Sequence, residues 1–456
     1  MNQYRTVPFE NTAIPKGIPY IIGNEAAERF SFYGMRAILV VFMTQYLVSA
    51  NGQADYMSAD EAKGWFHLFV SAVYFTPLLG ALISDGLLGK YKTIILLSLV
   101  YTLGHFALSL DDSRAGLAIG LGLIAIGAGG IKPCVSAHVG DQFSKTNSHL
   151  LPRVFGWFYF SINLGAFSST LLIPWILETY GSAAAFGIPG ILMLLATIIF
   201  WSGRYRFVHI PAGGKQFISE ALSSEGLKVL ARLSILYLFV AMFWALFDQT
   251  ASSWVLQAEK MDRTLFGIEL LPSQLQAANP LLVMLLIPVF TYLVYPAISK
   301  FFVLSPLRKI SIGLFITVFA FGISAITQEK IDAGLTPHIS WQILAYIVIT
   351  SAEVMISITC LEFSYTQAPV KMKSFIMAFF MMSIAIGNLF TSAVNFFIEN
   401  EDGTSKLAGA DYFWFFTLLM LITAVAFLFV AKTYKEKTHI QKGALAEKNA
   451  YKPAEP

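Results

Sequence analysis

The feature that most constrains the fold of this chain is a succession of apolar segments, each long enough to cross a lipid bilayer. A helix needs about 20 apolar residues to span the hydrocarbon core, and about twelve such segments follow one another along the chain. Only 13% of the 456 residues are charged, whereas soluble domains have about 25%. We therefore expect an all-α polytopic membrane protein with twelve transmembrane helices. Their predicted ranges are 18–49, 60–86, 91–110, 115–135, 152–177, 183–203, 229–256, 276–299, 309–327, 339–364, 372–399 and 411–432.

The longest polar connection, at residues 204–228, divides the apolar segments into two sets of six. Two such sets indicate a transporter that is built from repeats. The linker contains Pro211, Gly213 and Gly214, followed by a stretch whose pattern permits a surface amphipathic helix. The polar tail is expected to be disordered. The predicted organisation is an N-terminal segment at 1–17, a six-helix bundle at 18–203, the linker at 204–228, a second six-helix bundle at 229–432 and a tail at 433–456.

Basic residues predict the orientation of the chain in the membrane. If both termini lie in the cytoplasm, most of the 31 Lys and Arg residues fall on the cytoplasmic side of the predicted spans, as the positive-inside rule requires. The first apolar run contains charges and lacks a small-residue cleavage pattern, so we expect it to remain as a span. The two cysteines, Cys134 and Cys360, lie in or beside apolar runs, which argues against a disulfide scaffold.

Several ionisable residues lie inside the predicted spans, where a charge costs roughly 2.5–3.5 kcal/mol and usually has a function. The acids exceed the permanent cations by one, and a low dielectric disfavours the unpaired anion. We therefore hypothesise that this set holds one exchangeable proton, on a carboxylate or on a histidine. The acids are Glu25, Glu28, Asp248 and Glu353, the cations are Arg29, Arg36 and Lys132, and the histidine is His67.

The first span carries an unusually dense part of this set. One face of a helix here would carry four polar residues, Glu25, Arg29, Tyr33 and Arg36, because of their spacing. Glu28 lies beside that face. The simplest alternative is an ion pair that only holds helices together. A pair of that kind does not need a cluster of this size, so we favour a functional one.

Six stretches of the sequence resemble motifs of known transporters. "GALISDGLLGKYK" (80–92) resembles the cytoplasmic loop motif of the major facilitator superfamily. "EAAERFSFYGMR" (25–36) resembles the E-x-x-E-R-F-x-Y-Y-G motif of the proton-dependent oligopeptide transporters, the POT/PTR2 family, and 127–143 and 158–167 resemble its second and third signatures. Residues 243–254 and 351–369 are similar to its seventh and tenth spans. The chain is thus identified as a member of this family, which implies the major facilitator superfamily fold of two six-helix bundles.

The resemblance also implies roles for particular residues. Glu25, Glu28, Arg29 and His67 match proton-coupling positions, and Asp248 matches the partner of Arg36 in a salt bridge between the two halves. A peptide is zwitterionic, so its carboxylate fits Arg36 and Lys132 and its ammonium fits Glu353. The expected substrate-binding residues are Tyr33, Arg36, Tyr74, Lys132, Tyr159, Asn163, Trp244, Asn279 and Glu353.

Plainer interpretations exist for several of these residues. A lone histidine such as His67 is more often structural, and Tyr74 has the ordinary alternative of packing. Asn163 and Asn279 have the alternative of joining helices by hydrogen bonds. The sequence also departs from the family pattern at Phe32, which replaces a tyrosine, at His138, which replaces an aromatic residue, and at Ala166, which replaces a serine. The loss of the hydroxyl at Phe32 is expected to alter some peptide contacts.

The function implied by the resemblance is proton-coupled symport of di- and tripeptides by alternating access. The expected partners are peptides, protons and the lipid bilayer, with no cofactor, no metal and no nucleic acid, and the expected unit is a monomer in a bacterial inner membrane. The alternatives are a proton-coupled carrier of another small anionic or zwitterionic solute, and a membrane nutrient sensor on the same fold. Enzyme activity is not expected, because the sequence has no metal-ligand spacing, no nucleophile with a placed base and no phosphate loop.

Overall fold

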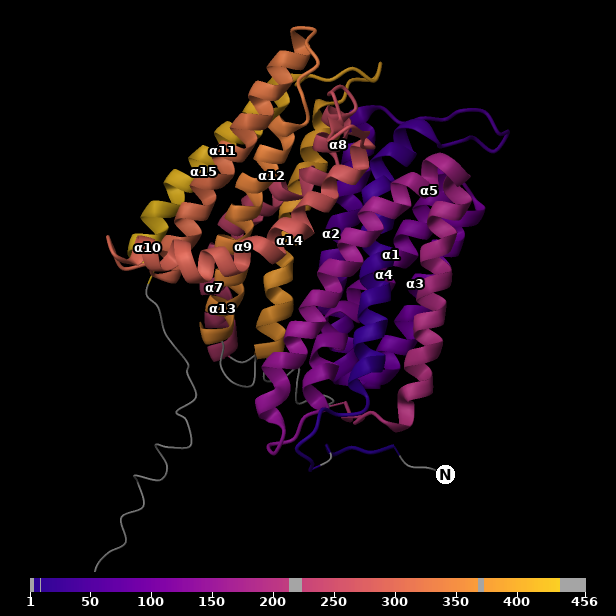
Figure 1. Cartoon of the computed structure of the whole chain (residues 1–456), viewed down its shortest axis with the longest axis vertical. Coiled ribbons are helices and arrows are strands. Elements are labelled where there is room, and N and C mark those ends of the chain that lie inside the picture. Colours follow the sequence, from indigo (N-terminus) through magenta and orange to yellow (C-terminus); the bar gives the residue numbers. More distant parts are fainter. Residues whose placement is uncertain (1–3, 9, 213–223, 368–372, 435–456) are drawn as a thin grey trace, which may run out of the picture.

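A computed structural model describes residues 4–8, 10–212, 224–367 and 373–434. Figure 1 shows two helical bundles side by side, the N-terminal bundle in indigo to magenta and the C-terminal bundle in orange to yellow. Residues 213–223 of the predicted linker lie outside the described residues, as does the tail beyond residue 434, whereas residues 224–228 of that linker belong to the first helix of the C-terminal bundle. We call the end of the molecule beside the N-terminal segment the proximal end, and the opposite end the distal end.

The N-terminal bundle is built from long helices with polar caps. Ser58 and Ser113 accept hydrogen bonds from the backbone N–H of Glu61 and Gly116, which satisfies free donors at the starts of α2 and α4. The longest helix, α5, reverses direction at Gly181, whose φ of 81° favours glycine. The helices are α1 (Ile18–Gln45), α2 (Ala59–Ile83), a π-helical turn (Ser84–Leu88), α3 (Lys90–Leu110), α4 (Arg114–Asp141) and α5 (Leu151–Ser202), with 3₁₀ turns at Ser148–Leu150 and Gly203–Tyr205.

The C-terminal bundle contains more interrupted helices. Its strands β1 (Thr264–Leu265) and β2 (Ile268–Glu269) form a short antiparallel hairpin at the distal end, with Thr264 opposite Glu269. The helices are α7 (Ser224–Phe247), α8 (Ser253–Ala258), α9 (Ala278–Val289), α10 (Tyr295–Ser299), α11 (Pro306–Asp332), α12 (Ser340–Glu353), α13 (Thr359–Gln367), α14 (Lys373–Ile398) and α15 (Ala410–Thr433). The interruptions are 3₁₀ turns at Asp248–Ala251 and Pro272–Ala277 and π-helical turns at Phe290–Val294 and Val354–Ile358.

The helices of the described residues are consistent with the twelve predicted spans. Ten helical stretches are long and apolar enough to cross a membrane. One of them, Ser148–Tyr205, has 58 residues and contains the reversal at Gly181, so it holds two spans. The helix α1 has spanning length but is not among the ten, and it is the helix that carries the dense set of charges.

Each bundle has its own apolar core. Phe42, Phe66 and Phe186 are fully buried in the N-terminal bundle, and Trp254 and Phe321 are fully buried in the C-terminal bundle. The opposite faces of the helices expose large apolar side chains, as a lipid environment requires. Examples are Leu103, Ile119, Leu238 and Phe429.

The two bundles meet where α2 lies antiparallel to α14. Ser58 donates to Glu399 at 2.5 Å, Ser392 donates to the carbonyl oxygen of Gly64 at 2.8 Å, and Ser71 donates to the carbonyl oxygen of Ala385 at 2.8 Å. These contacts run from the distal end to the middle of α2. Gly64 permits this close approach, because a Cβ atom there would lie 2.7 Å from the Phe396 ring, which would have to move. The bundles are therefore fastened together over the distal half of their interface.

Candidate functional site

A small cavity lies between the two bundles, below the distal contacts. Its volume is about 170 Å³, smaller than the roughly 300–1,000 Å³ of drug-sized ligand sites. The structure brings six of the nine predicted substrate-binding residues into its lining, from both bundles. They are Tyr33 and Arg36 on α1, Tyr159 and Asn163 on α5, Asn279 on α9 and Glu353 on α12.

Glu353 brings a negative charge to the C-terminal side of this cavity. It is the last residue of α12, directly before the π-helical turn Val354–Ile358, and such turns are frequent at functional sites. Asn279 donates to Glu353 Oε2 at 2.8 Å and to Thr350 Oγ1 at 3.1 Å. Glu353 forms no ion pair with any described residue. Its carboxylate is thus held in place by a neutral donor and is free to pair with a cation.

Arg36 lines the cavity and forms an ion pair with Asp248, the contact between the two halves that the resemblance implies. Asp248 begins a 3₁₀ turn directly after α7. The helix does not resume until Ser253, because Ser252 has a non-helical backbone with φ −131° and ψ −90°. Discontinuous helices of this kind are typical of transporter binding sites. Asp248 lies at this break in the middle of a span, and its carboxylate contacts the other bundle.

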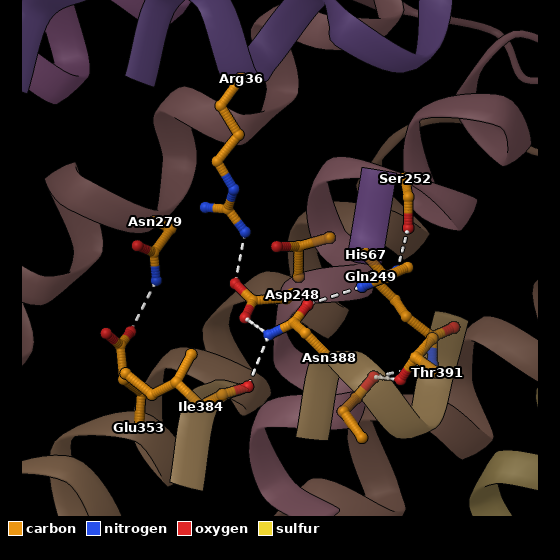
Figure 2. Close-up of polar contacts among 12 residues, drawn as sticks. Arg36, His67, Asp248, Gln249, Ser252, Asn279, Glu353, Ile384, Asn388 and Thr391 are labelled. Carbon is orange, nitrogen blue, oxygen red and sulfur yellow. Dashed lines mark hydrogen bonds and ion pairs between the residues drawn. The ribbon is translucent and has the colours of Figure 1, made fainter. Parts of the chain in front are cut away.

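A chain of hydrogen bonds continues from Asp248 to His67 (Figure 2). Asn388 on α14 donates its amide nitrogen to Asp248 Oδ2 at 2.6 Å, and its amide oxygen lies 2.7 Å from His67 Nδ1. An amide oxygen only accepts, so Nδ1 carries a hydrogen. His67 Nε2 lies 2.9 Å from Ser252 Oγ and accepts from that hydroxyl when the ring is neutral. Both nitrogens of the buried ring are therefore occupied.

Close packing of α14 on α7 positions Asn388. A Cβ atom at Gly387 would collide with the α7 backbone at Ala241 and lie 2.9 Å from the Ala245 nitrogen. Thr391, one turn further along α14, donates to the Ala245 carbonyl oxygen at 3.1 Å. Glycine at position 387 thus lets α14 approach α7 closely enough for the side-chain amide of Asn388 to reach Asp248.

The charged cluster on α1 is arranged around Arg29. Its Nε lies 2.7 Å from Glu25 Oε1 and 3.4 Å from Glu28 Oε2. Both carboxylates are buried, and neither oxygen of Glu28 accepts a hydrogen bond from a described residue. Two carboxylates therefore share one guanidinium, and burial disfavours the second negative charge. The arrangement is chemically suited to exchange of one proton.

The other three predicted substrate-binding residues, Tyr74, Lys132 and Trp244, are not in the cavity lining. Lys132 Nζ lies 3.7 Å from the ring centroid of Phe32 and 4.9 Å from that of Tyr74. It has no hydrogen-bond partner among the described residues, so its charge is stabilised by two aromatic rings. Trp244 packs against Phe247 with 5.4 Å between ring centroids, which places it behind the lining.

Two departures from the family pattern have a structural explanation. Phe32 is fully buried in the N-terminal bundle beneath Lys132 and does not line the cavity. His138 is buried near the proximal end, where its ring lies 5.9 Å from Phe200 and 5.2 Å from Phe207 between centroids. It therefore fills the space of an aromatic residue. Ala166 lines the cavity with a methyl group.

Asn388 and Ser252 are absent from the sequence-based prediction, although they join His67 to Asp248. Gln276, which lines the cavity and donates to the Ala37 carbonyl oxygen at 3.1 Å, is absent too. A signal for Asn388 exists in the sequence. Residues 388, 391, 392 and 395 are polar within an apolar run, and that spacing places them on one helix face.

Comparison with known proteins agrees with this architecture. The chain matches the POT family (PTR2) over residues 91–223 and 214–415. It is 38% identical over 365 residues to "Peptide transporter family 1" of Drosophila melanogaster, a match that covers 70% of this chain and 48% of the relative. It is 37% identical over 368 residues to human "Solute carrier family 15 member 2", which covers 70% of this chain and 49% of the relative. The chain thus aligns with about half the length of these relatives.

Two solved structures are similar over nearly their whole length. An auto-inhibited POT family peptide transporter has a TM-score of 0.83 and 35% identity, covering 94% of this chain and 99% of that one. The POT family transporter PepTSo has a TM-score of 0.82 and 36% identity, covering 92% and 98%. The protein therefore has the major facilitator superfamily fold. The matched segments cover most of the chain, and the chain belongs to the POT family.

Proposed function

We propose that this protein is a proton-coupled symporter that imports di- and tripeptides by alternating access, and that it is not an enzyme. The observation that carries the proposal is the cavity between the bundles, whose lining has a cation, Arg36, which also pairs with Asp248, and a carboxylate, Glu353, which forms no ion pair with a described residue. A short peptide carries the complementary pair of charges at its two ends. The small volume favours a small solute, and the names of the relatives refer to peptide transport.

In this proposal the cavity residues bind the constant parts of a peptide. Arg36 attracts the peptide carboxylate, Glu353 attracts the ammonium group, and Tyr33, Tyr159, Asn163 and Asn279 contact the amide groups. Lys132, Tyr74 and Trp244 belong to the wall behind that lining, and they reach the peptide only after side-chain movement. These contacts bind the termini and the backbone of the peptide, so peptides with many different side chains are accepted.

Proton coupling is assigned to the buried ionisable groups. Glu25, Glu28 and Arg29 form the proton switch on α1, because two carboxylates share one cation there. His67 and Asp248 link that switch to the bundle interface. Protonation of His67 at Nε2 would require only that the Ser252 hydroxyl rotate from donor to acceptor, since a hydroxyl serves in both roles. The ring thus gains a proton without losing a partner.

Alternating access uses the distal contacts as one gate. The ion pair of Arg36 with Asp248 and the hydrogen bonds between α2 and α14 close that side of the cavity. We propose that protonation and peptide binding weaken these contacts and let the bundles rock. The positive-inside rule places both termini in the cytoplasm, so the distal end faces outward. We also propose a bacterial inner membrane and a monomeric unit.

Uptake of a labelled dipeptide tests the proposal. Purified protein in liposomes should concentrate labelled dialanine when the outside is made acidic, and unlabelled di- and tripeptides should compete. Tetrapeptides and single amino acids should not compete. Competition by a non-peptide anion instead would indicate a carrier of another solute on this fold. Saturable dipeptide binding without accumulation would indicate a sensor, and either result would contradict peptide symport.

A further inference from the structure

A groove on the outer surface of the N-terminal bundle has no role in the proposed transport of peptides. Its volume is about 750 Å³, within the roughly 300–1,000 Å³ of small-molecule sites. It runs between α1 and α5, which pack against one another in that bundle (Figure 1). The lining contains two serine hydroxyls and no charged side chain, so it suits an apolar ligand.

The groove is separate from the peptide cavity, because the two use different faces of α5. Tyr159, Asn163 and Ala166 line the central cavity. Trp157, Phe160, Leu164 and Ser168 line the groove. Trp157, Phe160 and Leu164 are also 43%, 56% and 47% exposed, which places this face of the helix against lipid.

Small residues form the floor of the groove. Gly23, Ala26 and Ala27 on α1 and Gly165 on α5 all line it. At Gly165 the two helices touch, because a Cβ atom there would lie 2.9 Å from the Ala26 carbonyl oxygen. At Gly23 a Cβ atom would meet nothing within 4 Å. The floor is therefore closed at depth and open along its length, which is the shape needed to hold a chain.

Three basic residues lie close in the chain or in space to residues at the proximal end of this groove. Arg153 lies over the ring of Trp157 at 5.0 Å, and Trp157 lines the groove. Lys16 follows Ile14 and precedes Pro19, both of which line it. Arg206 shares a second small cavity with Lys16 and lies 5.1 Å over the ring of Tyr20. None of these three cations forms an ion pair with a described residue.

We propose that this groove binds one anionic phospholipid, with an acyl chain between α1 and α5 and its phosphate held by Lys16, Arg153 and Arg206. The apolar walls match the acyl chain, and the three nearby cations, which form no ion pair with a described residue, match the phosphate. Anionic headgroups are attracted to basic side chains at a membrane surface. The lipid would come from the leaflet on the side of the N-terminal segment, and its acyl chain would contact the helix that carries Glu25 and Arg29.

Native mass spectrometry of the full-length protein tests the site. The protein is purified in detergent and mixed with phosphatidylglycerol or phosphatidylcholine that have the same acyl chains. We expect one phosphatidylglycerol molecule to remain bound at a higher occupancy than phosphatidylcholine. Inorganic phosphate should not displace it, because the acyl chain contributes to binding. Equal retention of the two lipids would overturn the proposal.

A groove-filling variant tests the position of the acyl chain. Gly23→Phe adds a ring at a floor position where a Cβ atom meets nothing within 4 Å, and the ring is meant to block the acyl chain. Each buried methylene group of the acyl chain changes the lipid affinity by about fourfold. If the ring displaces a few of them, the affinity should fall by roughly tenfold or more. The matched control is Gly322→Phe on α11 in the other bundle, where a Cβ atom also meets nothing within 4 Å. Equal affinity in the two variants would place the lipid elsewhere.

A charge variant tests the headgroup. Substitution of Lys16, Arg153 and Arg206 by glutamine should lower the preference for phosphatidylglycerol by roughly fivefold per cation. The control replaces three basic residues of the other bundle, Lys300, Arg308 and Lys309, by glutamine. The control and the test variant therefore have the same net charge. A preference that falls equally in both triple variants would mean non-specific attraction and would contradict a built site. Loss of lipid binding with dipeptide uptake intact leaves the proposed function standing.

Discussion

Arg36 on α1 forms an ion pair with Asp248, which lies 212 positions further along the chain and in the other bundle. Both side chains are largely buried, at 11% and 5% exposed. Removal of one partner from a buried pair leaves an uncompensated charge, which costs roughly 3–5 kcal/mol. This contact therefore joins the two bundles through a buried ion pair, and loss of either partner is expected to destabilise their interface.

Exchange of the two charges tests whether this pair is a gate. Arg36→Asp and Asp248→Arg should each abolish peptide uptake, because each places two like charges in contact. The double variant should recover part of the stability that the single variants lose, as measured by thermal unfolding in detergent. It should recover less of the uptake, because Arg36 also lines the cavity. Full uptake in both single variants would exclude a gating pair.

Asn388 is predicted to transmit the state of His67 to Asp248. Asn388→Leu removes the donor to Asp248 and the acceptor for His67, at a cost of roughly 1–3 kcal/mol for each unsatisfied group. We expect gradient-driven uptake to fall sharply. The matched control is Asn395→Leu on the same helix. Asn395 contacts Thr391 and Tyr412 within the C-terminal bundle.

Thermal unfolding and uptake should be measured together for these two asparagine variants. Both should lose stability by similar amounts, and only Asn388→Leu should lose coupling. If Asn395→Leu impairs uptake to the same extent, Asn388 has a structural role alone.

Glu353 is predicted to recognise the amino terminus of the peptide. Glu353→Gln removes a charge-assisted contact worth roughly 1.5–3 kcal/mol, so competition by dialanine should weaken by roughly 10- to 100-fold. N-acetylated dialanine lacks the ammonium group, and its weak competition should not change. The control is Glu362→Gln, an exposed carboxylate on α13. Equal losses for the free and acetylated peptides would argue against this role.

The positions of many helices could be predicted because apolar length is a local property of the sequence. Predicted ranges such as 91–110 and 411–432 differ by at most one residue at each end from α3 (Lys90–Leu110) and α15 (Ala410–Thr433). The break after Asp248 was not predicted, since the surrounding residues still form an apolar run. Its backbone depends on contacts with α1 and α14, which are distant in sequence.

The candidate site was predicted unevenly for the same reason. The charged residues of α1 could be recognised as candidate functional residues from the sequence, because charges in an apolar span are rare. The partners of His67 could not be read from its own helix, since Asn388 lies 321 positions away and Ser252 lies 185 positions away. Lys132 and Trp244 were predicted to contact substrate, yet they lie behind the lining. A span specifies which residues are in the membrane, but helix packing decides which of them face the cavity.

In the proposed mechanism Glu25 and Glu28, which share the guanidinium of Arg29, couple a proton to transport. The most direct measurement compares two assays on Glu25→Gln and Glu28→Gln in proteoliposomes. One assay is accumulation of labelled dialanine driven by an imposed pH gradient, and the other is counterflow exchange without a gradient. We predict that both variants lose accumulation and retain exchange. Accumulation at the wild-type level in both variants would contradict the account.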